Sequence, residues 1–221
     1  MEITLSPFVL EKVPNFKVGI IQYDNIVVED SPQMLRGRLQ TFQESLFFDL
    51  EDKSFSDFQG ISEWRDTFKK IGTDPDRYRP SVEAIYRRIK KRNFLNLIHS
   101  AADLNNFFSM QYEIPIGIYD TDKIEGKVEI RIGHAQDEYV GINGRKISME
   151  NKLLSSDDLG AFGSPYVDSE RTAVTADTKN AIQIVYLKPS LSIESSEKLV
   201  ESLGTMFTQI HGGTVESFVL S

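Results

Sequence analysis

The fold is decided by RPSVEAIYRR (residues 79–88), ADLNN (102–106) and PIGIYD (115–120). The first stretch opens with proline and serine, which favour the first turn of a helix, and then repeats apolar residues at helical spacing. Residues 97–110 are mostly apolar and predict a second helix. From Ile116 onwards the apolar period shortens towards two, which is typical of strands. The centre of the chain is therefore predicted to pass from helices into a sheet.

The sequence on either side extends this pattern. We predict strands at 16–23, 128–132, 139–142, 181–187 and 215–220, and helices at 32–50, 61–71 and 194–211. Helices grouped in the first half and a meander in the second favour an α+β fold, with a mixed or antiparallel sheet and flanking helices, over a βαβ repeat. We expect one domain over 1–221, with a strand–helix part (1–64), a motif-bearing part (65–187) and a C-terminal helix and strand (188–221).

Composition restricts the environment of the chain. Of its 221 residues 40% are hydrophobic and 26% charged, and no segment approaches the ~18 apolar residues of a membrane span. The first residues lack the basic and apolar segments of a secretory signal. The absence of cysteine excludes disulfides, thiolate metal sites and a cysteine nucleophile. We therefore expect a soluble cytoplasmic protein without membrane association.

Charge is unevenly distributed along the sequence. The net charge of −8 argues against indiscriminate coating of nucleic acid. Between Arg65 and Arg92, however, ten Lys and Arg residues stand against four acids. This excess predicts either a phosphate-facing patch or a solvated helix face whose charges are neutralised by acids elsewhere.

The sequence contains no familiar catalytic or nucleotide-binding motif. It has neither a Gly-x-Ser-x-Gly elbow nor a Gly-x-x-x-x-Gly-Lys loop, and the glycines around 141–144 indicate a hairpin turn. His99, His134 and His211 lack metal-ligand spacing, so we expect neither a metal ion nor a cofactor. We interpret His99 as packed in a helix and His211 as a charged cap of a helix end, which leaves His134 as the best functional candidate among the three.

Two polar segments stand out as candidate sites. Asn105 and Asn106 interrupt a helical run, where they either brace neighbouring loops or contact a ligand. Residues 160–172 concentrate glycines, hydroxyls and charges between two strands. Such a loop either cradles an amino or ester group, or is a long connection tied down by Arg171 pairing with Asp168 or Glu170.

The order of these segments resembles a known module. Residues 81–88, 102–107, 115–120, 126–131 and 163–180 are similar to the B3/B4 module of the phenylalanyl-tRNA synthetase β subunit, and the chain resembles free-standing B3/B4-domain proteins. In the synthetase this module hydrolyses tyrosine wrongly attached to phenylalanine tRNA. The resemblance implies a B3/B4-like fold and a pocket that grips an amino acid and orients water at an already reactive ester.

The resemblance also assigns residues. Asn106 matches the pocket asparagine, Glu170 falls near the pocket glutamate, and Thr175 and Thr178 match a hydroxyl-rich strand entry. Gly117 stands where the synthetase has a histidine. That difference implies a different substrate, a water held by main chain and Glu170, or a module without hydrolysis.

The leading hypothesis is therefore a tRNA-binding protein that hydrolyses mischarged aminoacyl-tRNA in trans. The alternative is a non-catalytic module for an amino acid, peptide or protein partner. The predicted catalytic residue is Glu170. The predicted substrate-binding residues are Asn105, Asn106, Gly117, Gly163, Thr172 and Thr175, and the predicted RNA-binding residues are Arg77, Arg79, Arg87, Arg88, Lys91 and Arg92.

Overall fold

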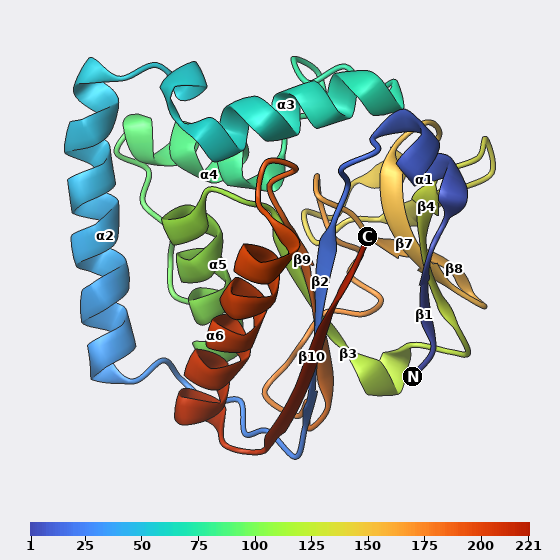
Figure 1. Cartoon of the computed structure of the whole chain (residues 1–221). Coiled ribbons are helices and arrows are strands. Elements are labelled where there is room, and N and C mark those ends of the chain that lie inside the picture. Colours follow the sequence, from blue (N-terminus) through green and yellow to red (C-terminus); the bar gives the residue numbers. More distant parts are fainter.

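A computed structural model describes all residues 1–221 (Figure 1). The strands are β1 (Ile3–Leu5), β2 (Val18–Asp24), β3 (Ile116–Asp120), β4 (Val128–Ile132), β5 (Glu138–Val140), β6 (Lys146–Ser148), β7 (Leu153–Asp157), β8 (Gly160–Gly163), β9 (Ala181–Tyr186) and β10 (Thr214–Leu220). The helices are α1 (Pro7–Lys12), α2 (Gln33–Asp52), α3 (Gln59–Ile71), α4 (Ser81–Lys90), α5 (Ser100–Tyr112) and α6 (Ile193–His211).

Two four-stranded sheets and a hairpin form the β structure. One sheet is antiparallel throughout, in the order β10-β2-β9-β3. The other, in the order β1-β4-β7-β8, is mixed, because β1 runs parallel to β4 while the remaining pairs are antiparallel. Strands β5 and β6 form the hairpin predicted around 141–144. The predicted α+β class is therefore confirmed.

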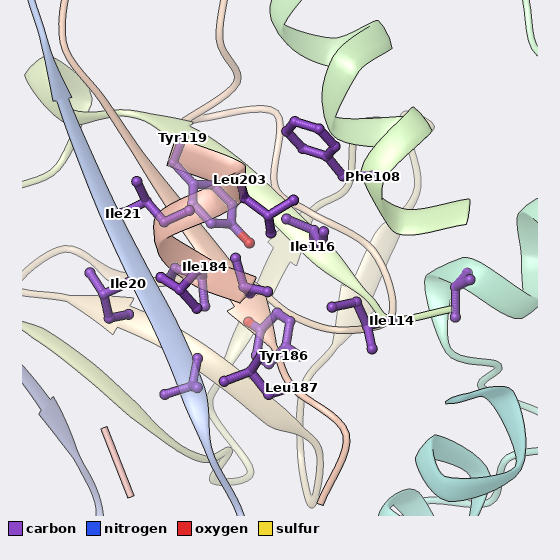
Figure 2. Packing of buried hydrophobic residues seen from close by; sticks show 14 of the residues in the cluster. Ile20, Ile21, Phe108, Ile114, Ile116, Tyr119, Ile184, Tyr186, Leu187 and Leu203 are labelled. Atoms are coloured by element: carbon purple, nitrogen blue, oxygen red, sulfur yellow. The ribbon is translucent and has the colours of Figure 1, made fainter. Parts of the chain in front are cut away.

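Strands β2, β9 and β3 of the antiparallel sheet are buried on both faces, whereas the edge strand β10 is largely exposed. Helices α5 and α6 pack on one face, with α2 outside them, and the mixed sheet lies towards the other (Figure 1). Figure 2 shows Ile21, Ile116 and Ile184 of this sheet together with Phe108 of α5 and Leu203 of α6, all within one large apolar cluster. Strands buried on both faces account for the continuous apolar runs in their sequences.

Several element boundaries follow from identifiable caps. Gly72 ends α3 in the left-handed region at φ 106°, and the Ser192 hydroxyl accepts the Ser195 N–H at the start of α6, as the sequence indicates. The predicted helix start at 97 is wrong: α5 begins at Ser100, because the His99 ring accepts the Ala102 N–H and the residues before it form a loop. No helix of the structure combines the length and apolar character needed to cross a membrane.

The sequence did not indicate β1, α1, β7 or β8, and it indicated β6 only through the predicted hairpin turn. Strand β7, LLSSD, is buried along its whole length and carries serines, so it shows neither an alternating nor a continuous apolar pattern. Its buried hydroxyls have partners elsewhere in the fold, for example Ser155 with the Tyr186 hydroxyl at 3.3 Å. Tertiary contacts therefore decide this strand rather than local sequence.

Candidate functional site

A cavity of about 600 Å³ opens at the β3 edge of the antiparallel sheet. Its walls come from α4, the loop before α5, α5 itself, β3 and residues 164–174, and they are largely apolar. The Ser81 N–H donates to the Pro165 carbonyl at 2.8 Å, which ties the start of α4 to the 164–174 segment. A volume of this size is typical of small-molecule sites.

Asp168 is the only acidic side chain lining the cavity. Its Oδ1 accepts the Tyr119 hydroxyl at 2.6 Å and the Ser164 N–H at 3.3 Å, whereas Oδ2 has no hydrogen-bond partner. No lysine or arginine forms an ion pair with it. Burial raises the pKa of the Asp168 carboxyl from its ordinary value of 3.8 to about 6, against the smaller opposing effect of its two donors. The cavity therefore presents an unpaired carboxylate oxygen at neutral pH.

Tyr119 reaches Asp168 because two glycines leave room for its phenol. A Cβ atom built on Gly117 or on Gly163 would overlap the Tyr119 hydroxyl. The ring is fully buried and lies edge-on to Phe162 at 5.0 Å between centroids. Gly117 and Gly163, which we predicted to bind substrate, are thus required to accommodate Tyr119. Burial raises the pKa of this phenol well above its usual range, so it stays a hydrogen-bond donor.

The two asparagines of α5 have different surroundings. Asn105 donates to the Ile116 carbonyl at 2.9 Å and accepts from Gln183 at 2.8 Å, and Gln183 in turn accepts the Tyr23 hydroxyl. Asn105 therefore braces α5 against the sheet although its side chain also borders the cavity. Asn106 lines the cavity without a hydrogen-bond partner in the protein, so its amide is available to a ligand.

Two of the three histidines are held by hydrogen bonds within the protein, and the third, His134, is exposed. His99 lines the cavity, but its ring is engaged by the Ala102 N–H and, at 3.1 Å, by the Val174 carbonyl. His134 does not line the cavity. His211 ends α6 as predicted, but not as a charged cap: burial lowers its pKa, and the neutral ring contacts the Phe207 carbonyl and the Ser100 hydroxyl, each at 2.9 Å. The side chains form no cluster of three or more His, Asp or Glu suited to a metal ion.

Comparison with known proteins identifies the family of this chain. A model of the B3/4 domain family matches residues 63–204. The chain belongs to the B3/4 domain family. The uncharacterized protein YhzB of Bacillus subtilis (strain 168) is 37% identical over 214 residues, which cover 97% of each chain.

Part of the chain is also similar to synthetase subunits. The phenylalanine–tRNA ligase β subunit of Fusobacterium nucleatum is 26% identical over 126 residues, 56% of this chain but only 16% of that subunit. An N-terminal fragment of the phenylalanyl-tRNA synthetase β subunit from Pyrococcus horikoshii aligns with all of this chain and 54% of the fragment, at 14% identity and a TM-score of 0.48.

In this B3/4 domain Glu170 lies outside the cavity. Its side chain is exposed and makes no hydrogen bond, while its backbone N–H donates to the Val140 carbonyl at 3.0 Å and its carbonyl accepts the Ala173 N–H at 3.3 Å. Asp168, two residues earlier, points into the cavity instead. No sequence motif marks Asp168. Gly117, two positions before Tyr119 on one strand, does indicate space for the Tyr119 side chain, because residues two apart on a strand lie on the same face.

The other residues of the 160–180 segment hold the loop in place. Arg171 pairs with Asp157 at 2.8 and 3.0 Å, so neither predicted pair, with Asp168 or with Glu170, forms. Asp157 is buried at the turn between β7 and β8 within reach of Arg171, while Asp168 faces the cavity. Thr172 is buried and Thr175 exposed, and neither lines the cavity.

The predicted RNA-binding cations divide into three groups. Arg87 pairs with the fully buried Glu83 at 2.7 Å, Arg65 contacts the same carboxylate at 3.0 Å, and Arg79 lies 4.0 Å from it. Arg88 and Lys91 are exposed and make no ion pair, and Arg88 lines the cavity. The remaining two lie against aromatic rings, Arg77 on Tyr78 and Arg92 on Phe47. The solvated-face interpretation thus fits part of the patch, and of the predicted cations without an ion pair only Arg88 lines the cavity.

Proposed function

We propose that this B3/4 domain binds the aminoacyl end of an aminoacyl-tRNA in its cavity and hydrolyses the ester in trans. The observation that carries the proposal is the unpaired Asp168 carboxylate in a largely apolar cavity. A half-buried carboxylate in an apolar cavity without a cationic partner is unfavourable unless a ligand supplies one. The ammonium group of an aminoacyl ester is such a partner, because it is cationic and carries three donors.

The remaining cavity suits the rest of an aminoacyl group. Apolar walls, including Ile85, Ile116 and Val174, accommodate the amino-acid side chain, and the Asn106 amide N–H can donate to the ester carbonyl. Asp168 and Asn106 together would orient the ester carbonyl. Glu170, the residue first predicted to be catalytic, has no role in this proposal.

The size of the cavity favours an aminoacyl-nucleoside over a free amino acid. A free amino acid fills only part of about 600 Å³, which leaves room for the terminal nucleoside. Ile98 and Ile142 line the cavity yet are 64% and 63% exposed, so they give its mouth an apolar surface against which a base can lie. Arg88 and Lys91 are placed to approach the adjoining phosphates.

Hydrolysis requires little further chemistry. Water forms a bond to the ester carbonyl carbon, the bond from that carbon to the ribose oxygen breaks, and the proton lost by water ends on the ribose oxygen. The products are a free amino acid and an uncharged tRNA. Positioning supplies much of the acceleration for an ester of this kind. The proposed substrate places the protein in the cytoplasm, where charged tRNA is present.

A second candidate is a binding module without hydrolysis, for a free amino acid or the N-terminus of a peptide. The observation that favours it is Gly117, because no imidazole projects from that position into the cavity. His99 does not replace it, since both of its nitrogens have protein partners. The same carboxylate would hold the ammonium group in this case.

The test is deacylation of a panel of correctly and incorrectly charged tRNAs by the wild type and three variants. Asp168→Asn keeps an acceptor for Tyr119 but removes the charge, Asn106→Ala removes the amide, and Glu170→Gln is the matched control outside the cavity. We expect one charged species to lose its amino acid faster with the wild type and Glu170→Gln only. Acceleration that persists in Asp168→Asn would overturn the proposal, and binding without hydrolysis would select the second candidate.

A further inference from the structure

We infer that Tyr119 is a positioning residue of this site: its phenol fills the space beside Gly117 and Gly163 and fixes Asp168 so that Oδ2 alone faces the cavity. The inference rests on the proposed function, because it explains how Asp168 is presented to a ligand. Its observations are nevertheless independent of any ligand. They are steric contacts and hydrogen bonds within the unliganded protein.

The steric part begins with β3. Residues two apart on a strand lie on one face, so the Tyr119 side chain and the vacant side-chain position at 117 share a face. The phenol leans back over Gly117, and Gly163 at the end of β8 completes the space from the second sheet. A side chain at either position would displace the hydroxyl. The two glycines and the tyrosine therefore form one unit.

The hydrogen-bonding part concerns the two oxygens of Asp168. Oδ1 accepts the Tyr119 hydroxyl at 2.6 Å and the Ser164 N–H at 3.3 Å. The first of these is a short charge-assisted bond when Asp168 is ionised. Because Tyr119 is fully buried and cannot swing away, Oδ1 is held in place. The carboxylate then offers its other oxygen, which no protein group contacts, to the cavity.

The other titratable groups near Asp168 act on it without a hydrogen bond. Arg88 and His99 line the same cavity, but His99 is held by protein partners and Arg88 makes no ion pair. Tyr139 donates to the Val167 carbonyl at 2.5 Å and to the Ser164 hydroxyl at 3.1 Å, and Tyr186 shares a contact with Ser155. These tyrosines are buried like Tyr119 but make no hydrogen bond with Asp168. Tyr139 therefore provides a matched control.

The first experiment follows the titration of Asp168 by carboxyl carbon NMR in the unliganded protein. Tyr119→Phe removes a hydrogen bond to the ionised form, so we expect the midpoint to rise by about one pH unit. Tyr139→Phe should leave it unchanged. The acidic limb of the pH profile of deacylation should move with the midpoint in Tyr119→Phe. An unchanged midpoint, or an equal change in Tyr139→Phe, would overturn the inference.

The second experiment tests the shared space. We expect Gly117→Ala to lower the melting temperature in the wild type and to lower it much less in the Tyr119→Leu background, where the hydroxyl and the outer ring carbons that the new Cβ would overlap are gone. An equal loss in both backgrounds would contradict the steric part. Neither experiment needs a substrate, so the absence of any deacylation or amino-acid binding would refute the proposed function while leaving the role of Tyr119 measurable.

Discussion

At the scale of residues, ionised Asp168 lowers the stability of the folded protein, although it is central to the proposed site. Its carboxyl has a pKa of about 6 in the folded protein and an ordinary value of 3.8. The folded state therefore binds more protons than the unfolded state between these values, and stability falls as pH rises through that window. Above pH 6 the free energy of unfolding stays lowered by the full cost of desolvating the ionised carboxylate. A residue that lowers stability and borders a cavity is a common mark of function.

We therefore predict that Asp168→Asn is more stable than the wild type at pH 7 to 8, by about 1–3 kcal/mol. Asparagine keeps an acceptor for Tyr119 and Ser164 but carries no charge. Urea unfolding at pH 4 and pH 8 should show a small difference at the lower pH and the full difference at the higher one. Equal stability at both would mean that the carboxylate carries no burial penalty.

At the scale of elements, α4 places its cations in two different roles. Arg87 is committed to the buried Glu83, one turn earlier on the same helix, and Arg65 of α3 shares that carboxylate. Arg88, the next residue, emerges at the cavity without an acidic partner. Arg87 therefore has a structural role, whereas Arg88, the next residue on the same helix, has the binding role that we propose.

We predict that the double variant Arg88→Gln, Lys91→Gln binds tRNA more weakly and has nearly unchanged stability. The slope of log K against log salt should become shallower by the amount expected for the loss of about two phosphate contacts. Arg87→Gln should do the reverse: it leaves Glu83 with fewer charged partners and lowers the free energy of unfolding by about 1–3 kcal/mol. Salt titrations of tRNA binding and urea unfolding of both variants measure these effects. Loss of tRNA binding confined to Arg87→Gln would reverse the assignment.

At the scale of the whole molecule, stability depends on contacts that join distant segments. His211 is an example, because its neutral ring links the end of α6 to Ser100 at the start of α5. Burial lowers its pKa below the ordinary value of 6.5. Its contribution to stability is therefore complete above pH 6.5 and is lost as pH falls from there through the lowered pKa.

We predict that, in the Asp168→Asn background, stability falls when the pH is lowered from 7.5 to 5.5, and that adding His211→Gln makes this fall smaller. The Asp168→Asn background is needed because Asp168 changes stability in the opposite direction over part of this range. Urea unfolding at the two pH values measures the effect. If His211→Gln does not change the fall in unfolding free energy between pH 7.5 and 5.5, the pH dependence belongs to other groups.

The sequence by itself determined the α+β class and the helices with apolar periodicity and clear caps. It also contained the ordered series of motifs that indicates the B3/4 domain family. These features depend on residues close together in the chain, such as Ser192 capping α6 or Gly72 ending α3. Only the tertiary structure decided that Asn105 braces the sheet while Asn106 faces the cavity, that Arg171 pairs with Asp157, and that Asp168 rather than Glu170 borders the site. Those outcomes depend on which side chains meet across β3, α5 and the 164–174 segment, and sequence spacing does not specify such distances.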